Sequence, residues 1–261
     1  MTQSTGDPRA TLPEPAVIAI SLGAFALAWL VAARLTDDPS ILPAPGEVWR
    51  IALEEAASGE LARHVAATLA RVAASFALAM GIGTALGIAL GSSPGLDRWL
   101  GPWVTVLLNV PALVVIVLCY LWIGLNEVAA ITAVAVNKTA MVAVNMREGV
   151  RALDPRVAEM ARVYRMGPGA RLVHVVLPQL APFVAASTRS GLAIIWKIVL
   201  VVEFLGRPDG VGFKIHLYFQ LFETGHVLAY AFSFVAVMLA LELAVLRGWE
   251  RRGSAWRRAE G

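Results

Sequence analysis

The sequence has one cysteine in 261 residues and lacks the short signatures of several common enzyme classes. A single cysteine excludes an intramolecular disulfide and any metal site built from several cysteines. Cys119 lies in the apolar run LVVIVLCYLW, where packing is its expected role. There is no Walker-type phosphate loop, HExxH or GxSxG. These absences argue against an ATPase, a zinc protease or a serine hydrolase, and no cofactor is expected.

Charged residues are also scarce. They make up 16% of the chain, whereas 58% of the residues are hydrophobic; a soluble domain has about a quarter charged residues. A bilayer core of about 30 Å needs about 20 helical residues. We therefore predict an all-α polytopic membrane protein with six transmembrane helices, at 16–33, 65–91, 102–124, 128–146, 179–202 and 227–246.

The first of these segments has an alternative interpretation as a cleaved signal peptide. One arginine and two acidic residues precede it, and its apolar core is longer than is usual for a signal. Both features favour an uncleaved span.

Charge asymmetry orients the predicted helices. Eleven of the 22 basic residues lie in 147–171 and in the tail from Arg247, whereas the linker 37–60 has one arginine and six acidic residues. Basic loops face the cytoplasm. We expect cytoplasmic tails at 1–15 and 251–261, and a transmembrane domain at 16–250 that includes a cytoplasmic loop at 147–178.

Several local patterns predict structure. The linker reads as a turn followed by an amphipathic helix, with Val48, Trp49, Ala52 and Leu53 toward the membrane or the bundle. Glycines every four residues at 83, 87 and 91 favour close helix packing. Pro111 should kink or loosen its helix, as a simple bend or beside a cavity. GRPDGVG at 206–212 lacks a strand–turn–helix context, which favours a polar surface turn.

The loop 147–178 is unusual between two apolar spans. Asp154 and Pro155 form a helix start, and the helix should run to Met166 and end in a left-handed cap at Gly167. A second short helix should open at Pro168, and Pro178 should break the chain before the next span. The apolar stripe of the first helix consists of Val157, Met160, Ala161 and Tyr164. The stripe lies either on lipid headgroups or against a partner.

The same loop resembles the EAA motif of ABC transporter permeases, the membrane subunits of binding-protein-dependent importers. Glu159, Ala161, Leu177 and Pro178 match that motif in type and spacing, whereas Met160 replaces its second residue and Arg165 replaces its glycine. The segments LPAPGEV, RVAASFALAMGIGTALGIALG, GVRALDP and VVEFLGRPDGVG resemble the nitrate/sulfonate/taurine branch of these permeases.

The resemblance implies the six-helix fold of small importer permeases in a bacterial inner membrane, with both termini cytoplasmic. It implies three protein partners: an ATP-binding cassette ATPase, a periplasmic substrate-binding protein and a second permease copy forming a homodimer. Membrane lipid is the other expected partner, and nucleic acid is not expected. The ATPase-coupling residues would be Val157, Glu159, Met160, Ala161, Tyr164, Gly167 and Pro178.

Ionisable and polar residues within the spans are candidates for the translocation path. Lys138, Lys197 and Asn109 lie inside predicted helices, where a charge costs about 2.5–3.5 kcal/mol or more unless it faces a cavity or a partner. The lysines could attract an anion. Alternatively, each could pair with Glu203, Glu127 or a helix end, or reach outward to water.

These observations predict a non-enzymatic permease subunit that forms the path of an ATP-driven importer for a small anion such as a sulfonate, taurine or nitrate. The alternative is a secondary carrier or channel that works without an ATPase. A carrier should show inverted repeats and mid-span acidic residues. No such repeat is evident, and Glu203 is the only acidic residue near span depth.

Overall fold

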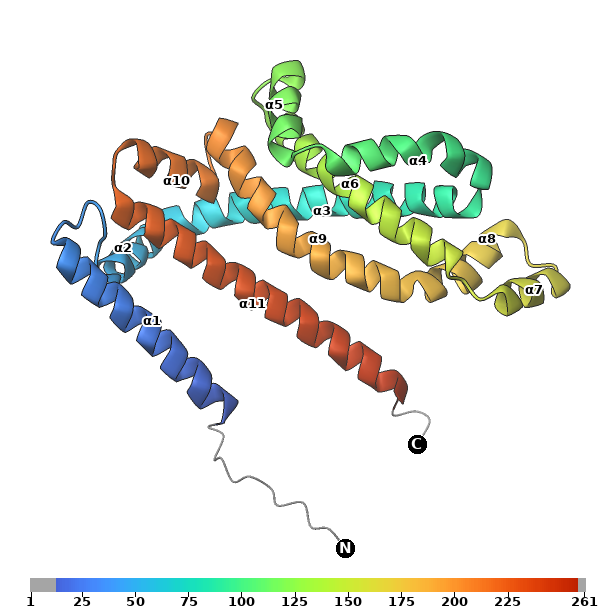
Figure 1. Ribbon diagram of the computed structural model, residues 1–261, viewed down its shortest axis with the longest axis horizontal. Helices are drawn as coiled ribbons and strands as arrows, with labels where there is room; N and C mark the ends of the chain where they lie inside the picture. Colours follow the sequence, from blue (N-terminus) through green and yellow to red (C-terminus); the bar gives the residue numbers. More distant parts are fainter. Residues whose placement is uncertain (1–12, 258–261) are drawn as a thin grey trace, which may run out of the picture. The chain divides into compact units, whose positions relative to one another are not determined.

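The computed structural model describes the backbone of residues 13–257 and the side chains of residues 13 and 16–242 (Figure 1). Within that range the chain is helical and contains no strand. It divides into two compact units, one of residues 58–217 and the other of residues up to 57 together with those from 218 onward. The predicted tails 1–15 and 251–261 lie largely outside the described residues.

The 58–217 unit is built on three long helices, α3 (Glu60–Ser92), α6 (Glu127–Arg151) and α9 (Leu177–Gly206), which contact one another. These contain the predicted spans 65–91, 128–146 and 179–202. Two shorter helices, α4 (Pro94–Asn109) and α5 (Ala112–Ile123), connect α3 to α6. The α6–α9 connection contains α7 (Pro155–Val163), α8 (Pro168–Arg171) and the π-helix η1 (Leu172–Val176), and α10 (Val211–Gln220) follows α9.

The glycines of α3 face α6, as predicted. A Cβ atom added at Gly83 would lie 2.6 Å from the Val142 Cβ, and one at Gly87 would lie 2.4 Å from the Met146 Cβ. Gly91 has the same relation to Val150, at 2.6 Å. The two backbones therefore approach closely along three turns because no side chain stands between them.

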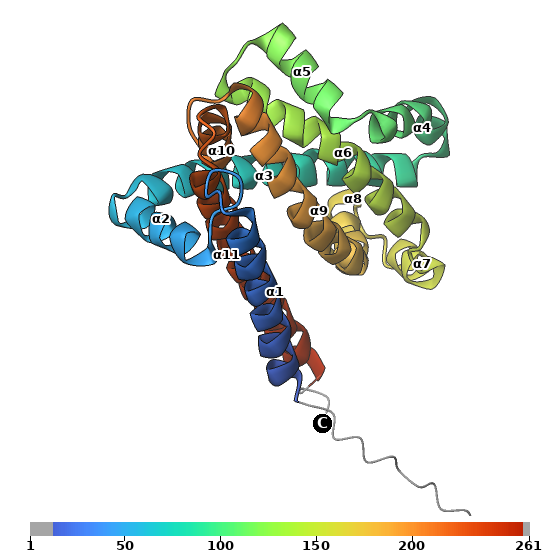
Figure 2. The same cartoon turned by 60° about the vertical axis from the view of Figure 1, so that its left-hand side comes forward.

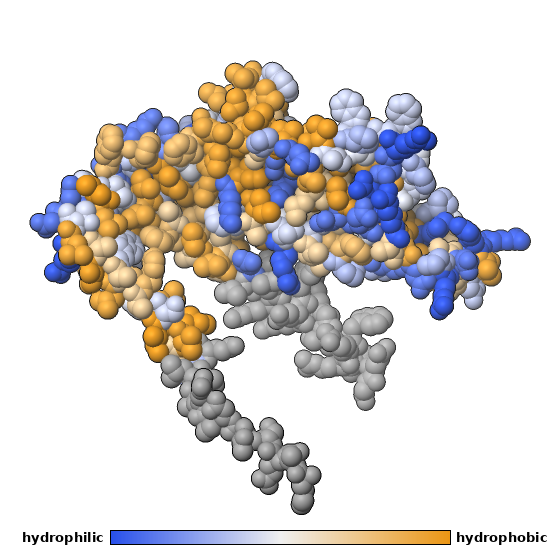
Figure 3. All heavy atoms as spheres, in the orientation of Figure 1, coloured by the Kyte–Doolittle hydropathy of each residue, from blue (hydrophilic) through white to orange (hydrophobic). Residues whose placement is uncertain are grey.

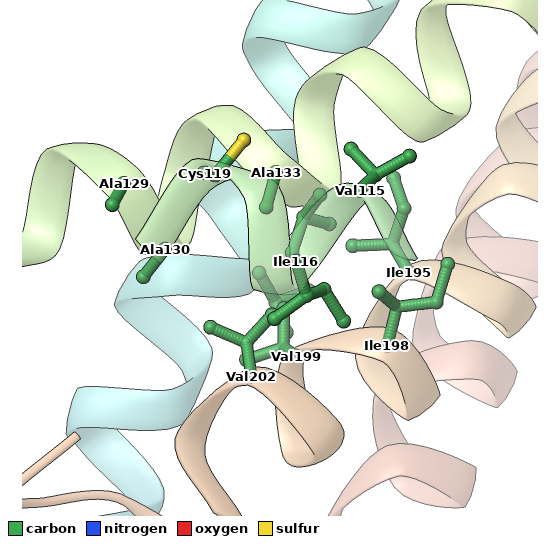
Figure 4. Packing of buried hydrophobic residues seen from close by; sticks show 12 residues of the cluster. Val115, Ile116, Cys119, Ala129, Ala130, Ala133, Ile195, Ile198, Val199 and Val202 are labelled. Carbon is green, nitrogen blue, oxygen red and sulfur yellow. The ribbon is translucent and has the colours of Figure 1, made fainter. Parts of the chain in front are cut away.

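The hydrophobic core of this unit lies where α3, α5, α6 and α9 meet (Figure 4). Ile116 of α5, Val134 of α6 and Val199 of α9 are each 1% exposed. Cys119 belongs to the same cluster, so its predicted packing role is confirmed.

The predicted span 102–124 is not one helix. Its two parts, α4 and α5, meet at an angle of 99° across Val110 and Pro111, and Figures 1 and 2 both show α5 leaving the line of α4. The Val110 N–H still bonds to Val106 O, whereas Pro111 has no N–H to continue the ladder. The break is much sharper than a loosened helix, and Figure 3 shows a hydrophobic surface over α5.

The other unit contains α1 (Glu14–Thr36), α2 (Pro45–Ala57) and α11 (Thr224–Arg257). Trp29 of α1 donates a hydrogen bond to Pro43 O at 3.0 Å. Val48 and Ile51 of α2 pack on Ala229 of α11. The predicted α2 helix is confirmed, but Trp49 and Leu53 are 67% and 52% exposed and do not join the packed face.

Four helices of the described chain are long and apolar enough to cross a membrane, or five if the bent α4–α5 pair counts as one span. They are α1, α3, α6 and α11. The helix α9 is absent from this group, and it carries Arg189, Lys197 and Glu203. The protein is therefore a multi-pass membrane protein, while the count of six spans stays a prediction.

Candidate coupling surface and buried polar sites

The helix α7 begins as the sequence predicts. Asp154 is its N-cap, and its carboxylate accepts a hydrogen bond from the Arg156 N–H at 2.8 Å. Pro155 occupies the first turn, where its missing N–H has no cost. The Asp154 N–H in turn donates to Gln179 Oε1 at 3.0 Å, which ties the start of α7 to α9. The sequence gives no signal for this tie, because the two residues are 25 positions apart.

The helix α7 ends earlier than predicted, and the residue with the left-handed backbone after it is a different one. Its last residue is Val163, and Arg165 has a φ of +50°, in the left-handed region. The Met166 N–H bonds to Ala161 O and the Arg165 N–H bonds to Arg162 O, both at 2.9 Å. This is the Schellman arrangement of a helix C-terminus, which favours glycine at the left-handed position. Gly167 has an extended backbone, so the predicted left-handed cap at Gly167 is wrong.

The predicted apolar stripe does not form one surface. Ala161 is 1% exposed and is covered by its own chain, and Val157 is half-buried. Met160, Val163 and Tyr164 point outward and are 49%, 79% and 75% exposed. Val163 is not one of the predicted stripe residues, although its spacing of three residues from Met160 places the two on the same side of a helix. We call Met160, Val163 and Tyr164 the α7 outer face.

Pro178 does not break the chain. The helical path continues from α8 through η1 into α9, and Pro178 lies near the start of α9. In η1 the Leu177 N–H bonds to Leu172 O, five residues back, which makes a wider turn directly before the proline. The wider turn leaves room for a ring that would clash in a regular helix. Glu159, Gly167 and Pro178 are all exposed.

An ionic cluster lies at the same end of the unit, between α4 and α6. Asp97 accepts from Arg147 at 3.1 Å and from Arg151 at 2.5 Å, and Glu148 contacts both arginines at 3.1 and 3.2 Å. Arg147 and Asp97 are only 18% and 19% exposed. Two of the six arginines of the loop therefore bind their own chain, and Arg156, Arg162 and Arg165 remain exposed around the α7 outer face.

The candidate path residues lie in different surroundings. Lys138 on α6 is 4% exposed, and its ammonium lies 3.3 Å from the sulfur of Met141. Lys197 on α9 is exposed, with its ammonium 5.5 Å from the ring centroid of Trp196. Asn109 is exposed at the end of α4 and donates to Thr105 O. Over the described residues neither lysine has an ion pair, so the alternative of pairing with Glu203 or Glu127 is wrong.

Glu203 is bound by a different cation. It is fully buried, and Arg71 of α3 donates to it at 2.7 Å. The same guanidinium bonds to Glu127 of α6 at 2.6 Å and to Asp209. Arg207 also binds Glu127, at 2.6 Å. Arg71 of α3 therefore links this helix to α6 and α9. We call Arg71, Glu127, Glu203, Arg207 and Asp209 the Arg71 network.

The glycine-rich segment 206–212 belongs to this network, so its prediction as a polar surface turn is wrong. The Gly212 N–H donates to Glu203 at 2.9 Å, the Val211 N–H to Thr68, and the Gly210 N–H to Nδ1 of the buried His64. A Cβ atom at Gly210, which has a φ of +106°, would lie 2.3 Å from the carboxylate carbon of Glu203, and one at Gly212 would lie 2.2 Å from Leu200 O. Only glycine allows the backbone to approach the carboxylate this closely.

Comparison with known proteins adds three findings. Residues 79–248 match the family described as binding-protein-dependent transport system inner membrane component. The chain is 32% identical over 218 residues to the putative aliphatic sulfonates transport permease protein SsuC of Bacillus subtilis, a match that covers 84% of this chain and 79% of that relative. It is 27% identical over 248 residues to the taurine transport system permease protein TauC of Escherichia coli, with 92% and 90% covered.

A solved structure is also similar. It is the crystal structure of an amino acid ABC transporter with histidines. The match has a TM-score of 0.53 and 22% identity, and it covers 70% of this chain and 91% of that chain. At this identity the likeness shows the fold alone, which is the importer-permease fold that the sequence predicted.

Proposed function

Because the chain belongs to the family of inner membrane components of binding-protein-dependent transport systems, it is the permease subunit of an ABC importer, and we propose that its α7 outer face receives the ATPase. The family works with a separate ATPase subunit and a substrate-binding protein. ATP hydrolysis therefore belongs to the partner, and this chain is not an enzyme.

The observation that carries the coupling proposal is the exposure of the α7 outer face. Val163 and Tyr164 are more than 70% exposed on a short helix surrounded by exposed arginines. A compact apolar patch with a polar rim is typical of a protein interface. The EAA resemblance supports this assignment, and Glu159 adds a charge at the rim.

Movement of α7 can reach the long helices through two contacts. Ala161 is buried on the opposite side of α7, and the Asp154 N–H is bonded to Gln179 near the start of α9. A push on the α7 outer face would therefore be transmitted to α9, whose far end carries Glu203 of the Arg71 network. In this proposal Ala161 supports the helix and does not contact the ATPase.

We propose a topology with six spans, α1, α3, the α4–α5 pair, α6, α9 and α11, and with both termini cytoplasmic. The basic α7 region supports that orientation. A homodimer would give the path its second half, as the two-fold symmetry of most homo-oligomers favours.

The proposed substrate is a small anion. The relatives are named for aliphatic sulfonates and taurine, and both compounds carry a sulfonate group. Lys197 is exposed on α9 and could attract such a group, and Asn109 could donate a hydrogen bond. Lys138 is a buried cation without an anionic partner in the described chain, which is costly unless a conformational change uncovers it. We place Lys138 in the path only when α6 and α9 separate.

The alternative of a secondary carrier finds less support in the geometry. Glu203, the acidic residue that could couple a proton or sodium ion, is bound by Arg71, Thr68 and the Gly212 N–H. A coupling carboxylate must exchange its ion in each cycle, whereas this one has a full set of fixed donors.

The test is Val163→Asp, with Val128→Asp as the matched control. Both valines are well exposed, at 79% and 64%, and Val128 lies at the opposite end of the unit, in the first turn of α6. We expect Val163→Asp to reduce co-purification of the ATPase by about tenfold, because it buries an unpaired charge at the contact. Val128→Asp should leave this unchanged. Undiminished ATPase recovery with Val163→Asp would reject the α7 outer face as the docking surface.

A further inference from the structure

A half-buried cavity of about 680 Å³ lies at the α7 end of the 58–217 unit. Its walls come from the last turns of α3 and α6, from α7 and α8, and from η1. The proposed coupling through the α7 outer face does not use this space, which adjoins the opposite side of α7 at Ala158. Its volume is in the range of small-molecule sites, which is about 300–1,000 Å³.

The lining of the cavity is apolar with one charge. Ile88 of α3, Val150 of α6, and Leu172 and Val176 of η1 supply hydrophobic walls from three elements. Arg171 is the only charged residue among the described residues that line it. Arg171 is half-buried and has no ion pair in the described part of the chain, unlike Arg147 and Arg151 nearby. A guanidinium in this position is a donor without an anion, next to a surface suited to hydrocarbon.

The position of the cavity at the end of α3 indicates which kind of ligand can reach it. Ser92 lines it and is the last residue of α3, a helix that is apolar and long enough to cross a bilayer. In the proposed topology the membrane-spanning part of α3 ends near Gly91, so the cavity would lie where this helix meets the headgroup layer. The π-turn η1 forms one wall, and such turns occur often at functional sites.

From this geometry we infer a binding site for an anionic phospholipid, with the phosphate on Arg171 and the upper part of one acyl chain over Ile88, Val150 and Leu172. Charge complementarity favours an anionic headgroup over a zwitterionic one, as in other basic pockets between helices at the cytoplasmic side of a membrane. The apolar walls favour a lipid over a free anion, because a free anion would leave them in contact with water.

The site adjoins the moving part of the subunit. Leu172 and Val176 belong to η1, and Ala158 and Met166 belong to the α7 region, so a bound lipid would contact both segments that join α6 to α9. The lipid would therefore stabilise one position of α7 relative to α3.

The test measures lipid retained by the permease purified in detergent without its ATPase, by native mass spectrometry, after addition of phosphatidylglycerol or phosphatidylcholine. Wild type should retain phosphatidylglycerol preferentially, and Arg171→Gln should lower that retention about fivefold or more. Arg171→Lys should keep much of it, which shows that the site is folded. Arg98→Gln is the matched control, because Arg98 is an exposed arginine of α4 outside the cavity, and it should behave as wild type.

Three results would overturn the inference. They are equal retention of the two lipids, equal losses with Arg171→Gln and Arg98→Gln, and displacement of phosphatidylglycerol by millimolar orthophosphate alone, which would indicate a simple anion site. A fourth result, loss of the lipid on addition of the ATPase, would assign the cavity to that protein instead. None of these measurements depends on transport, so failure here leaves the proposed coupling function intact.

Discussion

The two ends of the 58–217 unit differ in whether their charged side chains have partners within the chain. At one end, Arg71 binds three carboxylates, and a glycine-rich backbone encloses Glu203, which is fully buried. At the α7 end, Arg156, Arg162 and Arg165 are exposed, a cavity remains open beside Arg171, and Arg165 has a left-handed backbone. The first arrangement resists movement because its charges have fixed partners. The second keeps apolar and charged groups available for something outside the chain.

The difference between the two ends is tested most directly by removing Arg71. Arg71→Met should destabilise the unit by about 3–5 kcal/mol, because it leaves the buried Glu203 carboxylate without its cation. The measurement is the amount of protein in the membrane and its thermal unfolding in detergent. Glu203→Gln in the same chain should restore part of the loss, since a neutral side chain needs no cation.

The matched control is Arg147→Met at the other end. Arg147 bonds to Asp97, which is 19% exposed and retains Arg151 as a partner. Arg147→Met should therefore destabilise the unit much less than Arg71→Met. Equal destabilisation by the two substitutions would contradict the distinction between a fixed end and an available end.

The close approach of α3 and α6 between these two ends can be tested by Gly87→Val. The added side chain would meet Met146 and Ala143 O, with Cβ distances of 2.4 and 2.5 Å, and backbone cannot yield as a flexible side chain can. We expect a loss of about 2–3 kcal/mol in unfolding free energy. Gly81→Val is the control, since a Cβ atom there meets nothing within 4 Å. A similar loss at both glycines would indicate a general effect on the helix rather than on its packing.

The sequence predicted the helices well where a local pattern sufficed. The spacing of Gly83, Gly87 and Gly91 indicated the packed face of α3, and Asp154 with Pro155 marked the start of α7. The Arg71 network could not be found this way, because Arg71 and Glu203 are 132 residues apart and nothing local pairs them. The 99° bend at Pro111 was underestimated, since a proline fixes the break in the ladder and not the angle that tertiary packing selects.

The α7 segment shows how a local pattern can mislead. Gly167 was the obvious candidate for a left-handed residue, because glycine has no Cβ to strain there. The structure instead places Arg165 in that conformation and completes the Schellman bonds around it. The family resemblance had placed a glycine at position 165, so the motif identified the correct position where residue preference did not.

Substitutions of Lys197 and Lys138 test whether these two side chains take part in transport. Lys197→Met should lower uptake in membrane vesicles severalfold with assembly unchanged, because it removes an exposed charge that has no ion pair in the described chain. Lys138→Met should leave protein levels equal or higher, because it relieves a buried cation, and it should lower uptake if Lys138 enters the path on opening. Normal uptake in both variants would remove the lysines from the mechanism.

The smallest expected effect concerns the strained turn at the α7 end. Arg165→Gly should stabilise the closed turn by about 1 kcal/mol, since an L-residue in the left-handed region costs about 1–2 kcal/mol and glycine also loses more entropy on folding. Hydrogen exchange at the Met166 amide, which bonds to Ala161 O, should then slow about fivefold in the purified permease. Gly167→Ala serves as the control, because Gly167 has φ −64° and nothing within 4 Å of an added Cβ, so exchange should change little. Faster exchange with Gly167→Ala, together with unchanged exchange with Arg165→Gly, would place the left-handed cap at Gly167 after all. If the arginine is retained for its charge at the rim of the α7 outer face, Arg165→Gly should also weaken ATPase binding slightly while it stiffens the turn, a combination that a purely structural residue would not give.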